Sequence, residues 1–253
     1  MTSTFLDVRR EGAVEYVRLN RPDVRNALNE ELIAHLMSWA TAAAEDRSLR
    51  AAVLSGAGSS FCSGADLAWM AKMAAYTHDD NIKDATVAAQ MFAALDRLPF
   101  PVIARIHGAA IGGGTGLASI ADIAVAEAGA TFGFTEVRLG LVPAIIAPYV
   151  LAKIGESAAR ELFLTGRRFG AQEARSIGLV HAVVPAEELD RTIKSYVEDI
   201  LAGGPEAVAA AKVLIRQMSD SSRVDSVQQG VKAIAERRVS AEAQARMTAF
   251  LKK

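Results

Sequence analysis

Three consecutive glycines, Gly112 to Gly114, follow the apolar run "IHGAAI", and Gly116 comes two residues later. Glycine costs about 0.5–1 kcal/mol relative to alanine inside regular structure, so the cluster indicates a backbone that another group approaches closely. It is not a dinucleotide-binding loop, because G-x-G-x-x-G would need glycine where Leu117 stands. The G-K-[ST] of a phosphate loop and the G-x-S-x-G of a nucleophile elbow are also missing. We expect the glycines to begin a helix, whose free N–H groups and positive dipole end favour an anion.

Few other residues have the type and setting for chemistry. Glu136 lies between the apolar segments "TFGF" and "LGLVP", so we predict that it is buried and that desolvation raises its pKa toward neutral pH. Cys62 has no neighbouring His or Lys, and a small buried apolar side chain is the favoured interpretation. The histidines show no metal-binding spacing, so we predict no metal site; they are His35, His78, His107 and His181.

An α/β fold must position these residues. Alternating residues in 5–10 and 13–19 predict a hairpin, and the runs 50–56, 100–108 and 122–134 predict further strands. Asn29 is a candidate N-cap for a helix over 30–46, and 67–98 is predicted to be mostly helical with a break near 76–81. Residues from about 185 onward look helical. Gly64 and Gly113 would then follow strands, at the carboxyl ends where α/β proteins form their sites.

The composition excludes several function classes. The 253 residues carry a net charge of −1 with a pI near 6.4, which argues against nucleic-acid and anionic-membrane partners. No secretory signal or membrane helix is apparent, and one cysteine cannot form an intrachain disulfide. We therefore expect a cytoplasmic protein without membrane contact.

Four segments in order carry a family resemblance: "LNRPDVRNALN", "AGSSFCSGADL", "IHGAAIGGGTGLASIADIAVA" and "TFGFTEVRLGLVP". They resemble the signature segments of the crotonase superfamily, also called the enoyl-CoA hydratase/isomerase family, and the match extends from about residue 5 to 190. The resemblance implies an α/β fold, a crotonase-type spiral of repeated β-β-α units with a helical C-terminal segment. Residues 1–190 would form the core with the CoA and acyl site, and 191–253 would support a homotrimer or homohexamer.

The resemblance also implies chemistry on acyl-CoA thioesters, with coenzyme A as part of the substrate and no separate cofactor. The N–H groups of Ala65 and Gly113 would hold the enolate oxygen, and Glu136 would be the acid/base. Hydratases of the family carry a second glutamate where this chain has Gly116. Hydration of an enoyl-CoA is the first expectation, because "PAIIAPYVL" looks like branched-chain hydratases of the methylglutaconyl-CoA type. Δ3,Δ2-enoyl-CoA isomerisation with a single glutamate and non-catalytic acyl-CoA binding stay open as alternatives.

Binding residues follow from the same resemblance, each beside a simpler interpretation. Arg25 would contact the CoA phosphates or be a solvated side chain, Asp66 would contact CoA or cap a helix, and Trp69 would line the acyl pocket or pack in the core. The remaining predicted contacts with CoA or substrate are Ala27, Leu28, Ser63, Leu67, Ala68, Met70 and Gly112, with Met73 also expected near the acyl group. Phe250 and Lys253 would reach the CoA of a neighbouring subunit.

Overall fold

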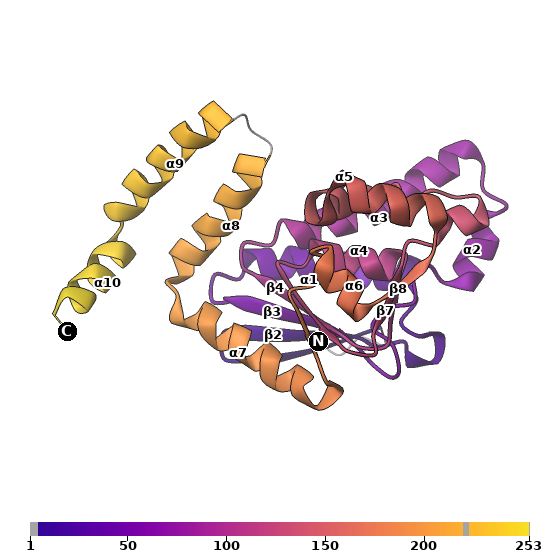
Figure 1. Cartoon of the computed structure of the whole chain (residues 1–253), viewed down its shortest axis with the longest axis horizontal. Helices are drawn as coiled ribbons and strands as arrows, with labels where there is room; N and C mark the ends of the chain where they lie inside the picture. Colours follow the sequence, from indigo (N-terminus) through magenta and orange to yellow (C-terminus); the bar gives the residue numbers. More distant parts are fainter. Residues whose placement is uncertain (1–4, 220–222, 253) are drawn as a thin grey trace.

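The computed structural model describes residues 5–219 and 223–252. The larger of its two sheets has the strand order β1-β2-β3-β4-β6-β9 (Figure 1). The first two strands form the predicted antiparallel hairpin, and each later strand is parallel to its neighbour. The strands are β1 (Leu6–Glu11), β2 (Val14–Leu19), β3 (Ala51–Gly56), β4 (Val102–Ile106), β6 (Ile123–Glu127) and β9 (Ala182–Val184).

The two faces of this sheet contribute side chains to two separate hydrophobic cores, because successive residues of a strand point to opposite sides. Ala51 and Val53 of β3 belong to a small core with the buried face of α7 (Leu189–Ala202). Ala52 and Leu54 belong to the larger core, which includes the apolar residues of the helices that precede the site. The sheet is therefore covered on both faces, as parallel sheets require.

A second, three-stranded sheet carries the glycine cluster. β5 (Ala109–Ile111) pairs in parallel with β7 (Thr131–Gly133), which pairs antiparallel with β8 (Arg168–Gly170). Helix α4 (Gly113–Ile120) begins two residues after β5 ends, so the predicted helix start at the glycines is confirmed. The short strands β5, β8 and β9 were not among the predicted elements.

The helices before the site have clear side-chain caps. Asn29 accepts a hydrogen bond from the Leu32 amide at 3.0 Å and begins α1, as predicted. The predicted break in the Ala-rich segment separates α2 from α3, and α3 begins with a capping box between Thr77 and Asp80. The helices are α1 (Glu30–Glu45), α2 (Leu67–Met73), α3 (His78–Asp96), α5 (Ala147–Thr165) and α6 (Ala171–Ser176), with short 3-10 turns at Pro22–Val24, Glu136–Leu139 and Ala186–Glu188.

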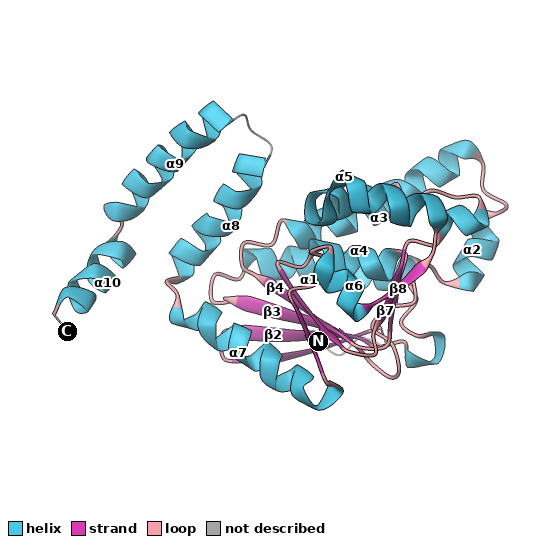
Figure 2. Ribbon diagram, viewed as in Figure 1, coloured by secondary structure: helices cyan, strands magenta, loops and turns pink. Residues whose placement is uncertain are grey.

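The C-terminal part is helical, as expected, and extends away from the sheets (Figure 2). It consists of α8 (Pro205–Ser219), α9 (Arg223–Arg238) and α10 (Ala241–Leu251). Lys212 of α8 ties this arm to the core, since its ammonium donates to the Phe100 carbonyl at 3.0 Å and to Asp122 at 2.7 Å. Helix α7 spans the expected boundary at residue 190, and the division into two functional parts stays a prediction. None of the described helices combines the length and apolar character needed to cross a membrane.

Candidate active site

The loop after β3 is held by a short backbone ladder that fixes the Ala65 amide. Ser63 N–H donates to the Arg25 carbonyl at 3.0 Å, and Leu28 N–H donates to the Gly64 carbonyl at 2.7 Å. Asp66 N–H then donates to the Leu28 carbonyl at 2.8 Å. These bonds use the amides on either side of Ala65. The Ala65 N–H itself donates to no acceptor within the described residues.

The glycine cluster brings α4 against this loop. A Cβ on Gly114 would lie 2.1 Å from the Cys62 carbonyl oxygen, and a Cβ on Gly113 would lie 2.7 Å from Leu28 Cδ1. Real side chains essentially never approach so closely, so only glycine allows this contact between the two loops. Gly112 N–H donates to the Gly133 carbonyl at 2.8 Å, which anchors the turn to β7. The close approach predicted from the glycines is therefore an approach of the chain to itself.

Gly113 is the first residue of α4, and its N–H has no acceptor in the part of the chain that is described. Ala65 and Gly113 line one cavity of about 310 Å³, together with Glu136. The start of a helix adds the positive end of its dipole at Gly113. The cavity is thus lined by two residues with unpaired main-chain N–H groups and by the carboxyl group of Glu136, supplied by three separate segments.

Glu136 begins a 3-10 turn three residues after β7 ends, which places its side chain beside the glycine turn. A Cβ on Gly112 would lie 3.0 Å from Glu136 Oε1. Glu136 Oε2 is buried and has no hydrogen-bond partner among the described residues. Burial raises the pKa of this carboxyl above its ordinary value of 4.5, against a smaller lowering by a backbone hydrogen bond. Glu136 as a whole is half-buried, and the predicted direction of its pKa change is confirmed. Such a carboxyl group is able to exchange protons with a molecule in the cavity.

The space beside Gly116 is filled by apolar side chains. A Cβ on Gly116 would lie 2.3 Å from Ile146 Cγ2 and 3.1 Å from Phe92 Cε1. Ile146 is 3% exposed and Phe92 is also buried, so neither side chain can move into solvent. A glutamate at this position would therefore displace Ile146. Within the cavity lining, Glu136 and Asp84 are the carboxyl groups.

Asp66 is held within the protein. Its Oδ1 accepts from the amides of Ala68 at 2.8 Å and Trp69 at 3.3 Å, and its Oδ2 pairs with Arg21 at 2.9 Å. Burial alone would raise the pKa of Asp66, but the hydrogen bonds from Arg21 and these amides outweigh it and leave the pKa below its ordinary value. The helix-cap interpretation is confirmed. Arg21 also donates to the Ala27 carbonyl, so it connects the two loop segments that are hydrogen-bonded to each other around Ala65.

Comparison with known proteins decides the family, since the family described as enoyl-CoA hydratase/isomerase matches residues 9–253. The chain belongs to this family. It is similar to the short-chain-enoyl-CoA hydratase of Clostridium acetobutylicum, with 34% identity over 212 residues that make up 83% of this chain and 80% of that protein. An enoyl-CoA hydratase from Shewanella pealeana has a similar structure, with a TM-score of 0.94 at 33% identity over 98% of this chain and 93% of that one. One from Mycobacterium smegmatis gives 0.93 at 32% identity, covering 98% and 96%. The expected crotonase fold is confirmed.

For this member of the enoyl-CoA hydratase/isomerase family, the structure brings part of the predicted set together. Leu28, Trp69 and Met73 line the cavity with Ala65, Gly113 and Glu136. The other predicted contacts lie outside its lining: Arg25, Ala27, Ser63, Asp66, Leu67, Ala68, Met70 and Gly112. Arg25, Leu67 and Ala68 are exposed, and Ser63 donates to the Val24 carbonyl at 3.3 Å.

The C-terminal contacts are remote from the cavity of the same chain. Phe250 is 77% exposed on α10, which Figure 1 shows on the opposite side of the molecule from α2. Lys253 lies outside the described residues. Any contact of Phe250 with CoA would therefore involve another subunit, and it stays a prediction.

Several cavity residues were missed by the sequence analysis. Asp84, Ala85, Ala88 and Phe92 form one face of α3, at a spacing typical of a helix that packs along one side. That pattern was visible in the sequence, but it does not distinguish a pocket wall from a core. Ile146 belongs to the "PAIIAPYVL" segment that was noted only as a family variant.

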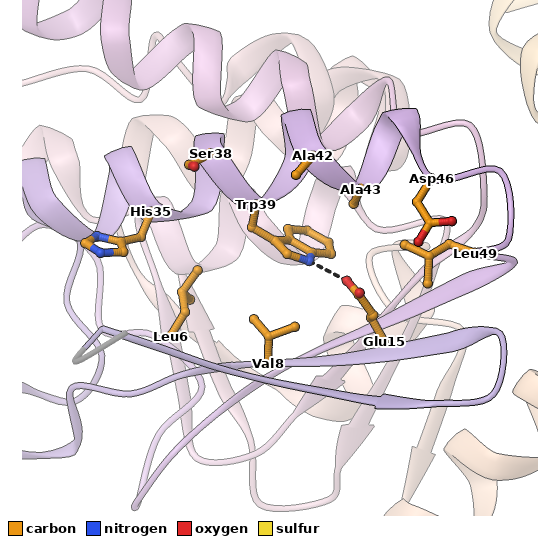
Figure 3. Close-up of a pocket in the computed structure, with 10 residues that line it drawn as sticks. All are labelled: Leu6, Val8, Glu15, His35, Ser38, Trp39, Ala42, Ala43, Asp46 and Leu49. Carbon is orange, nitrogen blue, oxygen red and sulfur yellow. Dashed lines mark hydrogen bonds between the residues drawn. The ribbon is translucent and has the colours of Figure 1, made fainter. Parts of the chain in front are cut away.

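Another hollow, of about 290 Å³, lies between α1 and the β1–β2 hairpin (Figure 3). Both carboxyl groups in its lining are paired within the protein, because Glu15 accepts from the Trp39 indole at 2.7 Å and Asp46 pairs with Arg10 at 2.6 Å. His35 Nδ1 lies 2.7 Å from the Glu31 carbonyl oxygen. This hollow offers no unpaired carboxyl group among the described residues that line it. Within the described residues, no cluster of three or more His, Cys, Asp or Glu is arranged to hold a metal.

Proposed function

We propose that this protein adds water across the 2,3-double bond of an enoyl-CoA thioester. One observation carries the proposal: the unpaired N–H groups of Ala65 and Gly113 share a cavity with the buried carboxyl of Glu136. Both N–H groups would donate to the thioester oxygen as it becomes negative. Each such donor is typically worth about 2.7–4 kcal/mol in the transition state.

Glu136 would act first as base and then as acid. Its carboxylate accepts a proton from a water molecule while the water oxygen bonds to C3, and the electron pair of the double bond moves through C2 to the thioester oxygen. The enolate then collapses as Glu136 returns that proton to C2. One group serves both steps, so the hydrogen and the hydroxyl add to the same face. No further cofactor is needed, because coenzyme A arrives with the substrate.

Isomerisation is the second candidate, and Ile146 is the observation that favours it. A shift of a double bond from C3–C4 to C2–C3 needs one base and the same two N–H groups. The side chain of Ile146 occupies the space where a second glutamate would stand. Relatives named as hydratases make hydration the first choice.

The exposed apolar face of the C-terminal arm favours assembly with further copies of the chain, for which the family resemblance implies three or six. Helix α9 exposes an apolar stripe at helical spacing, formed by Val224, Val227, Val231 and Ile234, each at least 50% exposed. Such a continuous stripe is typical of a face that another chain covers. In that assembly Phe250 and Lys253 would approach the CoA of a neighbour, while Arg25 and the backbone of residues 65–68 would contact the CoA of their own site.

The test follows the absorbance of the conjugated enoyl thioester when crotonyl-CoA is added to the purified protein. Loss of absorbance with formation of 3-hydroxybutyryl-CoA supports hydration, and a Glu136→Gln variant should lower the rate by about 100-fold to 10,000-fold. Glu156→Gln is the matched control, because Glu156 is exposed and pairs only with Arg160 on its own helix. Appearance of the conjugated absorbance from a 3-enoyl-CoA, without hydration, would instead establish the isomerase.

A further inference from the structure

One wall of the cavity is made by a hydrogen-bonded pair of side chains from two helices. Trp69 of α2 donates its indole N–H to Asp84 Oδ1 of α3 at 3.1 Å. Trp69 is only 8% exposed, and both side chains line the cavity that contains Ala65 and Gly113. The pair is therefore part of the space that an acyl group would occupy.

The same side chains also line a second hollow. This outer hollow has a volume of about 450 Å³ and shares Ile33, Trp69 and Asp84 with the catalytic cavity. Its other lining residues are Glu30, Tyr76, Asp80, Lys83 and Val87. Ile33, Trp69 and Asp84 thus form a partition between the two spaces.

The partition is braced on both sides. Asp66 caps the start of α2 and accepts from the Trp69 amide, and Lys72 of α2 pairs with Glu30 of α1 at 3.2 Å. On the other side, α3 begins with the capping box of Thr77 and Asp80, and Asp80 lies about one turn before Asp84. These contacts hold the indole and the carboxyl in one relative position, so the wall does not depend on their hydrogen bond alone.

The partition also contains the carboxyl group of Asp84. The positively charged side chains near it, Lys72 and Lys83, do not line the catalytic cavity, and no Lys, Arg or His is among the described residues that do. A carboxylate at the end of an acyl chain would meet Asp84 without a compensating cation. Burying an unpaired charge, or two like charges together, is strongly unfavourable.

We propose that Trp69 and Asp84 set the acyl specificity of the enzyme, limiting it to short enoyl chains without an anionic tail, unlike the carboxylate-bearing substrate of the methylglutaconyl-CoA-type hydratases that "PAIIAPYVL" resembles. This inference rests on the proposed function, because it concerns the substrate of the same cavity. A long chain would have to cross the partition into the outer hollow. Trp69 blocks that path by its size, and Asp84 excludes carboxylates by its charge.

The first test compares kcat/KM for dodecenoyl-CoA with kcat/KM for crotonyl-CoA. Trp69→Ala should raise this ratio by about tenfold or more, because it joins the two hollows; pocket changes of a single methylene already produce effects near that size. Trp69→Leu, which keeps more of the core packing, should raise it less and guards against misfolding of the alanine variant.

Tyr76 provides the matched control, because it lines the outer hollow but not the catalytic cavity. Tyr76→Ala alone should leave the ratio unchanged. Combined with Trp69→Ala it should reduce the gain for dodecenoyl-CoA, since the long chain would then contact the altered surface. Folded Trp69 variants, verified by circular dichroism, that keep the wild-type ratio would overturn the size argument.

The second test addresses charge. Asp84→Asn keeps the shape and an oxygen acceptor for the Trp69 indole, and should raise turnover of glutaconyl-CoA relative to crotonyl-CoA by about tenfold, because the like charge is removed. An unchanged ratio would overturn the charge argument. If the wild-type protein hydrates no enoyl-CoA, the proposed function fails, and calorimetric binding of butyryl-CoA and lauroyl-CoA to wild type and Trp69→Ala still tests the partition.

Discussion

Replacing Gly116 by alanine tests whether Ile146 occupies the space of a second acidic side chain. Gly116 lies within α4, where alanine is intrinsically favoured over glycine by about 1 kcal/mol. The structure opposes this gain, because the new Cβ would lie 2.3 Å from Ile146 Cγ2, 3.0 Å from Ile146 Cβ and 3.1 Å from Phe92 Cε1. Overpacking a buried site typically costs about 1–3 kcal/mol. With three atoms of two buried side chains in the way, we expect a cost in the upper part of this range, about 2–3 kcal/mol, and therefore a net loss of about 1–2 kcal/mol in the free energy of unfolding.

The measurement is urea denaturation of four proteins: wild type, Gly116→Ala, Ile146→Ala and the double variant. Ile146→Ala alone should cost about 2–5 kcal/mol, because it leaves a cavity. In the double variant the new methyl group enters that cavity, so its loss should be smaller than the sum of the single losses by about 1 kcal/mol or more. Gly230→Ala in α9 is the control, since its Cβ would meet only the flexible end of Met218 at 3.1 Å, and it should not destabilise. A Gly116→Ala variant as stable as wild type, or strictly additive losses, would refute the assignment of this space to Ile146.

Three further outcomes follow from the charged groups. Because burial raises the pKa of Glu136, kcat/KM for crotonyl-CoA should fall as the pH is lowered, with the midpoint of this fall above pH 4.5. The residual kcat/KM of Glu136→Gln should not show this fall. A midpoint at or below pH 4.5 would contradict the role of burial. Arg21→Met leaves Asp66 buried without its cation, so the free energy of unfolding measured by urea denaturation should fall by about 3 kcal/mol. We also expect kcat to fall by a larger factor than KM rises. An unchanged kcat would show that Arg21 does not help to position Ala65. Burial lowers the pKa of Lys153 to about 8, so between pH 8 and 10.5 the unfolded chain holds a proton that the folded chain has released. The free energy of unfolding of wild type relative to that of Lys153→Met should therefore rise with pH across this window. A difference that stays constant with pH would contradict the prediction.

Much of the site was predictable because it is made of main chain and local sequence. The glycine cluster indicated a close approach, and Gly113 and Gly114 do lie within contact distance of the opposite loop. Asn29 and Asp66 act as helix caps, which depend on residues only two or three positions away. The alternation in residues 5–19 predicted the hairpin for the same reason.

The remaining features depend on contacts between distant segments. The strands β5, β8 and β9 contain three residues each, too few for any periodicity to be visible, and they exist through their partners in the sheets. Trp69 and Asp84 are 15 residues apart on different helices, and their hydrogen bond follows from how those helices pack. Ile146 was visible in the sequence as part of the "PAIIAPYVL" segment that resembles branched-chain hydratases. Its contact with Gly116 required the fold.

That contact also bears on the proposed mechanism, in which one carboxyl serves a reaction for which the family resemblance implies two. Ile146 fills the space beside Gly116. It lines the same cavity as Glu136, whose pKa is raised by burial. A carboxylate with a raised pKa is a stronger base toward water, and its protonated form is stable enough to keep the proton until C2 is ready to accept it. In the proposed mechanism, the apolar side chain at the position of the second acid would thus help to adjust Glu136 for both proton transfers. If this is right, Ile146→Ala should admit water, shift the acid limb of the pH–rate profile of kcat/KM downward and slow proton return to C2.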